Sequence, residues 1–206
     1  MKLQNMTTFY IVRHGQTQWN IEQKIQGQTD NPLTALGEQQ ATVLANELED
    51  IAFECIYSSD LNRAHRTAQI IADKKKLPVR TTKSLRERNM GTFEGKEIHS
   101  ENEYLLLSKW FTKVTNGKSK KIGVESDEEV MSRFLTFVDE KIKEENGKTI
   151  LLVTHGSLIK AVLVHLGFAQ HDQLIHGAIK NTAYLALQSD GNSFFIKDMK
   201  GISIQK

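Results

Sequence analysis

Two stretches of the sequence share one arrangement, in which an apolar run is followed by a polar residue, a histidine and a glycine. FYIVRHG occupies positions 9–15 and LLVTHG positions 151–156, so His14 and His155 are equivalent. A neutral imidazole can act as a nucleophile or carry a proton. If each run is a buried strand of a parallel sheet, both histidines follow carboxyl ends, where such sheets bind ligands. We therefore expect the two rings to face one crevice.

Arginines and glycines near these histidines favour the binding of an anion. Arg13 precedes His14, and Arg63 joins the site if the loop after the second strand lies beside the first. Guanidinium donors match phosphate oxygens in a planar fork. We expect Gly15 and Gly156 to let the backbone turn sharply and to bring N–H groups close to an anion. A phosphate monoester is the natural ligand of such a pocket.

The elements that would position these residues alternate between strands and helices. Apolar runs predict strands at 8–12, at 53–57 and from 78, and helical periodicity predicts helices over 35–48 and 61–76. Thr34 would cap the first helix, and Ser58, Ser59 and Asp60 the second. This β-α-β-α-β order predicts a three-layer α/β/α sandwich with a mainly parallel sheet.

The second half of the chain continues this pattern after an irregular segment. Ser126 and Glu129 form a capping box before a helix over 128–145, which Gly147 ends. A strand in TILLVTHGS, a helix over 158–166 and a hairpin of strands at 183–188 and 194–198 follow. Periodicity is weak over about 88–123, where the apolar YLLLSKWF stands out. We expect a partly helical insertion there, within a single domain spanning 1–206.

Composition excludes several classes of protein. The 206 residues hold 27 Lys+Arg against 25 Asp+Glu, a formal net charge of +2, which argues against a dedicated nucleic-acid binder. No run reaches the roughly 18 apolar residues that span a bilayer. The single Cys55 cannot form an internal disulfide, and the other five histidines show no metal-ligand spacing. These features predict a cytoplasmic protein without a metal, cofactor, nucleic-acid or membrane partner, and leave its oligomeric state open.

Five blocks carry a resemblance to a known family. Residues 12–37, VRHGQTQWNIEQKIQGQTDNPLTALG, closely resemble the N-terminal signature of the histidine phosphatase superfamily, also called the phosphoglycerate mutase family. SSDLNRAHRTA, LRERNMGTFEG, VESDEEVMSRF and VTHGSLIKAVL follow in the order typical of that family. The resemblance covers about residues 8–165 and implies a phosphoglycerate mutase-like fold.

The resemblance also implies a role for each matched residue. His14 would attack phosphorus and become a phosphohistidine, while Arg13, Arg63 and His155 hold the phosphate oxygens. Glu87 would protonate the leaving alkoxide and then deprotonate the attacking water. No metal is required by this mechanism, because arginine and histidine neutralise the charge. The residues expected to complete the phosphate and substrate contacts are Gln16, Thr17, Asn20, Gln26, Gly27 and Gly156.

Simpler roles compete with these assignments. Arg63 could pair with Asp60 on its own helix, and Glu87 with the arginines on either side of it, which would leave Glu94 as the next carboxylate candidate. Asn20 and Gln26 could simply be turn residues.

The family implied by the resemblance contains both mutases and phosphatases. The short spacing between Glu87 and His155, the end of the chain soon after its last hairpin, and RHGQT in place of the RHGES usual in mutases all favour a phosphatase. We predict a phosphatase that hydrolyses phosphate monoesters. The alternatives are a cofactor-dependent phosphoglycerate mutase and a non-catalytic module that binds a phosphorylated ligand.

Overall fold

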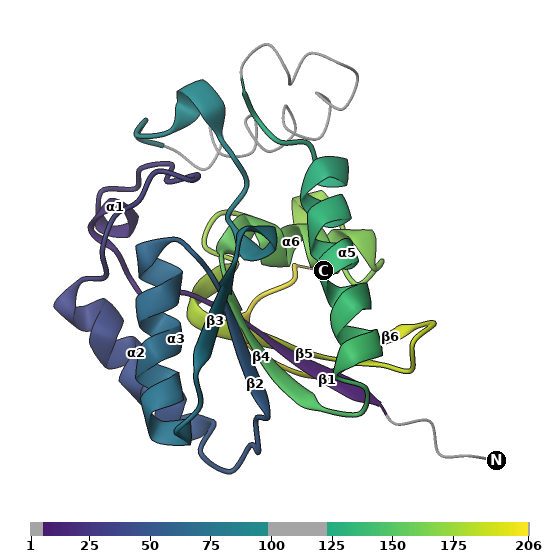
Figure 1. Ribbon diagram of the computed structural model, residues 1–206. Coiled ribbons are helices and arrows are strands. Elements are labelled where there is room, and N and C mark those ends of the chain that lie inside the picture. Colours follow the sequence, from purple (N-terminus) through teal and green to yellow (C-terminus); the bar gives the residue numbers. More distant parts are fainter. Residues whose placement is uncertain (1–5, 99–122, 206) are drawn as a thin grey trace.

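The computed structural model describes residues 6–98 and 123–205 and has a six-stranded sheet at its centre (Figure 1). The strands lie in the order β3-β2-β4-β1-β5-β6. Neighbours from β3 to β1 are parallel, whereas β5 pairs antiparallel with both β1 and β6. The predicted mainly parallel sheet and C-terminal hairpin are therefore confirmed. The bounds are β1 Thr7–Arg13, β2 Cys55–Ser59, β3 Val79–Thr82, β4 Thr149–Thr154, β5 Ile179–Ser189 and β6 Phe194–Ile202.

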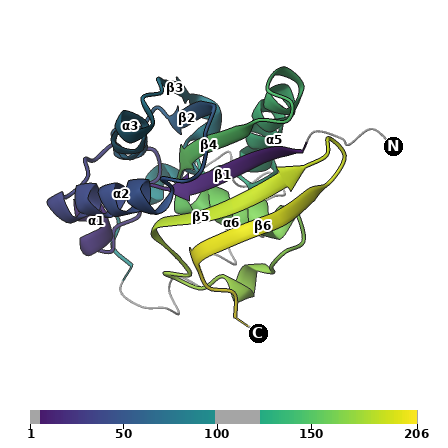
Figure 2. The same cartoon turned by 90° about the horizontal axis from the view of Figure 1, so that it is seen from below.

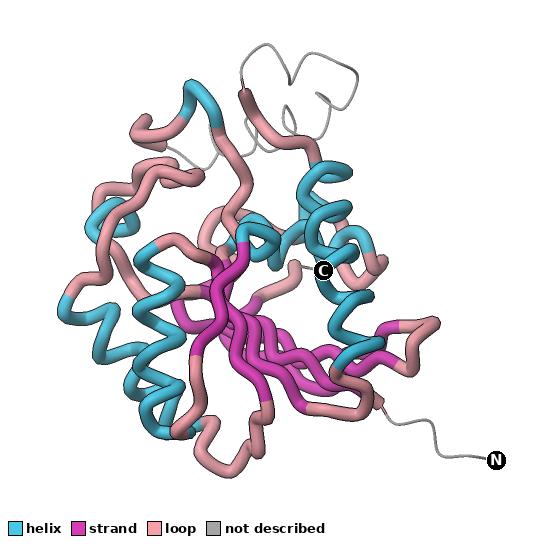
Figure 3. The backbone as a smooth tube through the Cα atoms, viewed as in Figure 1, coloured by secondary structure: helices cyan, strands magenta, loops and turns pink. Residues whose placement is uncertain are grey.

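Helices cover both faces of the sheet, as Figures 2 and 3 show. Alternate residues of β1 point to opposite faces: Phe9 and Ile11 pack among side chains of α5 and α6, and Tyr10 and Val12 among those of α2 and α3. The two buried clusters give the predicted three-layer α/β/α architecture. The helices are α1 Gln18–Ile21, α2 Ala35–Glu47, α3 Asn62–Lys75, α5 Asp127–Glu144 and α6 Gly156–His165, with 3₁₀ turns at Lys83–Leu85, Gly91–Phe93 and His171–Gln173.

The strand order brings the two histidine motifs together. β1 and β4 are parallel neighbours, and Arg13 pairs with Thr154 at the last register position. His14 and His155 are the next residues after these two strands, and the backbone N–H of His14 donates to the Thr154 carbonyl at 3.0 Å. Both motifs therefore leave the sheet at the same edge.

Helix starts agree with the sequence at two of three predicted caps. Thr34 accepts from the N–H of Gly37, and Ser126 forms the expected reciprocal capping box. The predicted cap of α3 is wrong, because Leu61 occupies the N-cap without a side-chain bond. Asp30 accepts from the N–H of Asn62 instead, at 3.0 Å. A carboxylate 32 positions earlier in the chain thus satisfies this helix end.

Close contacts, and not a left-handed backbone, distinguish the two motif glycines, and their predicted approach to an anion stays a prediction. Neither Gly15 nor Gly156 has a left-handed backbone. A Cβ on Gly15 would lie 2.4 Å from the carbonyl oxygen of Gly37, so the close approach of two backbone segments excludes any side chain there. Gly156 begins α6, and its nearest neighbour, Nε of Arg13, would be 3.4 Å from a Cβ.

The predicted insertion over about 88–123 lies largely outside the described residues, as does YLLLSKWF. Its described part, 88–98, contains the 3₁₀ turn and two isolated bridges, Met90 with Val124 and Glu97 with Lys24. None of the helices in the described segments is long and apolar enough to cross a membrane.

Candidate active site

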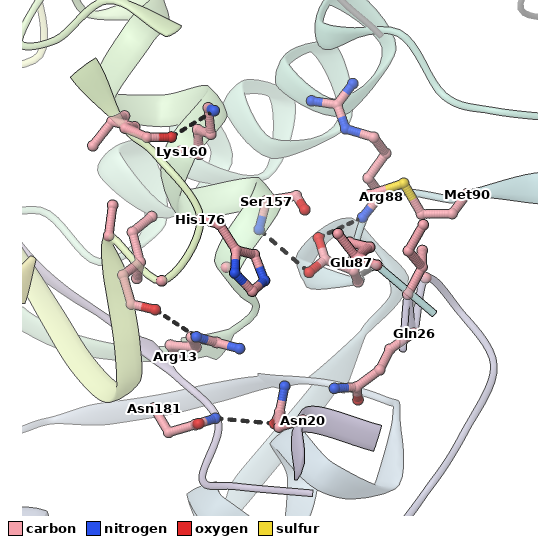
Figure 4. A pocket seen from close by; sticks show the side chains of 18 of the residues that line it. Arg13, Asn20, Gln26, Glu87, Arg88, Met90, Ser157, Lys160, His176 and Asn181 are labelled. Carbon is pink, nitrogen blue, oxygen red and sulfur yellow. Dashed lines mark hydrogen bonds between the residues drawn. The ribbon is translucent and has the colours of Figure 1, made fainter. Parts of the chain in front are cut away.

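A cavity of about 330 Å³ opens where the histidine motifs leave the sheet (Figure 4). Its walls come from the end of β1, the start of β5 and the 171–178 segment before it, α6, the segment after α1 and the loop around Glu87. The residues expected from the sequence that line it are Arg13, His14, Asn20, Gln26, Gly27, Glu87 and Gly156.

His14 is held as a neutral ring with one defined proton position. Its side chain is 2% exposed, and Nδ1 lies 2.7 Å from the carbonyl oxygen of Gly15. Because a carbonyl only accepts, Nδ1 carries the proton and Nε2 keeps a free lone pair. Burial, followed by the charges of Arg63 and Arg13, lowers the pKa of His14 well below its ordinary value. The ring is therefore uncharged at neutral pH, with a lone pair on Nε2.

His155 lies against His14 and is fully buried. The ring centroids are 5.1 Å apart at an interplanar angle of 61°. Burial is the main cause that lowers the pKa of His155, and Arg63 and His14 add to it. Within the described residues neither ring nitrogen has a hydrogen-bond partner. Leaving a buried polar group without a partner costs about 1–3 kcal/mol, and the His155 ring is not part of the cavity lining.

Arg63 is a fully buried cation whose side chain is not part of the cavity lining. Its Nη1 donates to the Thr29 carbonyl at 2.9 Å and Nη2 to the Gly27 carbonyl at 2.7 Å, while Nε has no partner among the described residues. Burial lowers the pKa of Arg63 to about 10, so the side chain stays charged at neutral pH. The alternative pairing of Arg63 with Asp60 is wrong.

Glu87 is the carboxylate that faces the cavity. Its Oε2 accepts from the N–H of Ser157 in the first turn of α6 at 3.3 Å, and Oε1 from the N–H of Arg88 at 2.8 Å (Figure 4). The arginines on either side pair elsewhere, with Asp60 and Asp127. Glu94 accepts from the N–H groups of the 28–29 turn and does not line the cavity.

The predicted polar contacts divide into two groups. Asn20 and Gln26 reach the cavity, and Figure 4 shows their amide nitrogens pointing into it. Gln16 and Thr17 do not line it. Gln16 accepts from the Thr34 hydroxyl at 3.1 Å, and Thr17 caps α1. The predicted ligand role of Gln16 and Thr17 is therefore unsupported, since both side chains shape the loop that carries Asn20.

Asn181 is a site residue that the sequence did not indicate. Its amide nitrogen donates to the carbonyl of His14 at 3.1 Å and to Oδ1 of Asn20 at 3.2 Å. The next residue, Thr182, has a left-handed backbone with φ of 57°. A register shift in the β5–β6 pairing spans this point, between Ile179 and Tyr184. Bulges of this kind turn a side chain toward a site.

Charged side chains at the start of α5 and along α6 line another part of the cavity. Asp127 binds both Arg88 and His171, the latter at 2.9 Å. Burial raises the pKa of Asp127, but the hydrogen bonds from His171 and Arg88 outweigh burial and lower it to about 2. Lys160 and His176 belong to the same lining. His171 and His176, two of the five histidines outside the motifs, belong to this lining.

Metal ligands are not grouped in the part of the chain that the structure describes. Within 6–98 and 123–205 there is no set of three or more His, Cys, Asp and Glu side chains that could hold a metal ion. Arg63 and Arg13 place positive charge beside His14. That the reaction needs no metal stays a prediction.

Comparisons with known proteins agree with this architecture. The family model described as histidine phosphatase superfamily, branch 1, matches residues 9–201. The probable phosphoglycerate mutase GpmB of Escherichia fergusonii is 41% identical over 153 residues, which cover 73% of this chain and 70% of that protein. The phosphoglycerate mutase of Bacillus anthracis superposes with a TM-score of 0.81 at 26% identity, covering 97% of this chain and 94% of the other. The phosphoserine phosphatase of Entamoeba histolytica, solved with 3-phosphoglyceric acid, gives 0.77 at 29% identity over 94% and 96%.

Proposed function

The chain belongs to the histidine phosphatase superfamily, and on that premise we propose that it hydrolyses small phosphate monoesters through a phosphohistidine on His14. One observation carries the proposal. A neutral imidazole with a free Nε2 lies 5.1 Å, centroid to centroid, from a fully buried His155 whose ring nitrogens lack partners among the described residues. The charges of Arg63 and Arg13 act on the same ring and help to lower the pKa of His14. A phosphate group would fill these empty hydrogen-bonding positions.

The first step transfers the phosphoryl group to the protein. Nε2 of His14 forms a bond to phosphorus while the bond from phosphorus to the ester oxygen breaks. Arg13, Arg63 and His155 stabilise the charge on the three oxygens that do not react. Glu87, which faces the cavity, gives its proton to the departing oxygen.

The second step returns the phosphoryl group to water. Glu87, now ionised, takes a proton from a water molecule, whose oxygen bonds to phosphorus as the nitrogen–phosphorus bond breaks. His14 is restored with its lone pair on Nε2. The N–H groups of Ser157 and Arg88, which donate to the two oxygens of Glu87, fix the carboxylate in position for both proton transfers.

Phosphoglycerate mutase is the second candidate, and a specific observation favours it. The curated relative at 41% identity carries the name of a probable phosphoglycerate mutase. A mutase returns the phosphoryl group to another hydroxyl of the substrate and excludes water, so the two reactions differ only in the acceptor. The phosphoserine phosphatase neighbour, at 29% identity, supports hydrolysis on the same fold.

Phosphate release from an aryl phosphate in excess EDTA tests the proposal. We expect turnover that survives the chelator and falls by at least about 10³-fold in His14→Ala, since the nucleophile is removed. A second assay supplies 3-phosphoglycerate with 2,3-bisphosphoglycerate. Formation of the isomer without inorganic phosphate would establish the mutase instead. Binding of the ester with no turnover in either assay would identify a non-catalytic module.

A further inference from the structure

The carboxylate that faces the cavity stands on a segment without regular structure. Residues 86–89 carry Glu87 between two 3₁₀ turns and belong to neither a helix nor a strand. A group that transfers a proton must stay within about 0.5 Å of its productive position, and misplacement by 1 Å can cost about 100-fold in rate. One of the two N–H groups that hold the Glu87 carboxylate, that of Arg88, lies on the same segment. Contacts from other elements must therefore hold the backbone of this segment.

Arg133 on α5 binds the backbone of the segment at two points. Its Nη1 donates to the carbonyl of Ser84 at 2.8 Å, and its Nη2 donates to the carbonyl of Glu87 itself at 3.2 Å, where the Gln28 amide also donates at 3.0 Å. Helical side chains lean toward the N-terminus of their helix, so Arg133 reaches back along α5 toward the segment. Its side chain is 19% exposed and does not line the cavity. The guanidinium thus joins a long helix to the residue that carries the carboxylate.

Glu125, just before α5, fixes the orientation of Arg133. Its Oε1 accepts from Nε of Arg133 at 2.9 Å and its Oε2 from Nη2 at 3.1 Å. Oε2 also accepts from the N–H of Asn89 at 2.8 Å, and the N–H of Glu125 donates to the Asn89 carbonyl at 2.9 Å. A planar guanidinium bound to both oxygens of a carboxylate has its donors aimed in fixed directions. The two side chains therefore hold the backbone on both sides of Glu87.

We propose that Arg133, oriented by Glu125, is a positioning residue that keeps the Glu87 carboxylate in place for its two proton transfers. This inference rests on the proposed phosphatase function. Arg133 does not line the cavity, so its effect on the reaction passes through Glu87. Loss of its hydrogen bonds should weaken proton transfer to the leaving group and spare the attack by His14.

Two esters that differ in their need for a proton separate these effects. The 4-nitrophenolate of 4-nitrophenyl phosphate leaves readily as an anion, whereas the alkoxide of glycerol 3-phosphate must be protonated as it departs. The kcat/KM value reports the step in which the ester bond breaks. We expect Arg133→Met to lower kcat/KM about 10- to 100-fold for glycerol 3-phosphate and at most about threefold for the aryl ester, because general acid catalysis supplies roughly 10²- to 10⁴-fold.

Three further variants calibrate the measurement. Glu87→Gln removes the acid itself and should show the same selectivity with a larger loss. Arg133→Lys keeps the charge but replaces the planar fork by a single nitrogen, so its loss should be intermediate, and it serves if the methionine variant does not fold. Ser126→Ala is the control, because it weakens the start of α5 and leaves both side chains of the Arg133–Glu125 pair in place. We expect it to change the two kcat/KM values by the same factor.

The outcomes separate the inference from the function on which it rests. Equal losses for the two esters in Arg133→Met and Arg133→Lys, beside a selective loss in Glu87→Gln, would overturn the positioning role. A Glu87→Gln variant without selectivity would refute Glu87 as the acid and the inference with it. No turnover of either ester by the wild type would refute the phosphatase itself.

Arg133 also acts on His155, and the ratio of the two kcat/KM values removes that effect. Burial is the main cause that lowers the pKa of His155, and the charge of Arg133 adds to it after those of Arg63 and His14. His155 would hold a phosphate oxygen in both esters, so a change at its ring lowers both values alike. Only an effect on the leaving group changes the ratio.

Discussion

Replacement by alanine should affect protein stability at one of the two motif glycines but not at the other. Gly15 and Gly156 follow equivalent histidines at the ends of adjacent parallel strands, and the sequence treats them alike. In the structure Gly15 meets the backbone of Gly37, whereas Gly156 meets the Arg13 side chain. We therefore expect Gly15→Ala to damage the fold and Gly156→Ala to damage only the site.

The magnitudes follow from the space available. A Cβ on Gly15 would lie 2.4 Å from the Gly37 carbonyl oxygen and 3.0 Å from its carbon, and a backbone cannot move aside as a side chain can. Overpacking of this kind costs about 3 kcal/mol, the upper part of its usual range. A Cβ on Gly156 makes contacts of 3.4–3.7 Å, and alanine is the better helix former. The free energy of unfolding of the Gly156→Ala variant should stay within about 0.5 kcal/mol of the wild-type value.

Urea unfolding followed by circular dichroism measures both effects, and phosphate release measures the consequence for the site. Gly15→Ala should lose stability and activity together. Gly156→Ala should keep its midpoint but lose activity, because the methyl group enters the cavity beside Arg13. Similar losses of stability in the two variants would refute the reasoning, since shared motif chemistry rather than local packing would then explain both glycines.

Three further outcomes are expected. Asn181→Ala removes the amide that holds the His14 carbonyl and Asn20, and should lower kcat about 10-fold with little change in Tm; an unchanged kcat would contradict the positioning role. In the folded protein His14 and His155 stay neutral, because their pKa values are lowered, whereas in the unfolded chain they take up protons below about pH 6.5. The free energy of unfolding should therefore fall as the pH decreases from about 6.5. Urea titrations at a series of pH values below about 6.5 measure this, and a free energy of unfolding that does not change with pH would contradict it. Ser126→Ala removes a capping box far along the chain from the motifs and should cost about 1 kcal/mol in thermal unfolding, whereas a Tm equal to the wild type would count against it.

Periodic patterns were sufficient to predict most of the fold. Buried apolar runs marked β1 and β4, and the capping signals at Thr34 and Ser126 lay within four residues of the groups they satisfy. The start of α3 was mispredicted because its partner is distant: Asp30 reaches Asn62 from another loop. Local sequence offered nearby serines instead, and nothing in their spacing showed that a remote carboxylate would replace them.

The site residues also divide into those that local sequence predicts and those that only the packing of distant segments places. The histidine motifs and Glu87 stood in blocks that could be matched, so they were found. The sequence did not indicate Asn181 as a site residue, because its orientation depends on a bulge in β5 and no residue type there predicts a bulge. Lys160 has the appearance of an ordinary helical lysine, and its half-buried position becomes visible only when α6 packs against the Leu174 segment.

Detection of the covalent intermediate tests the central claim most directly. The protein is mixed rapidly with excess aryl phosphate, quenched in alkali, which preserves phosphohistidine, and digested for mass spectrometry. We expect one phosphoryl group on the peptide that contains His14, and none on the same peptide from His14→Ala. Release of inorganic phosphate by the wild type without a phosphorylated His14 at any time point would contradict the mechanism.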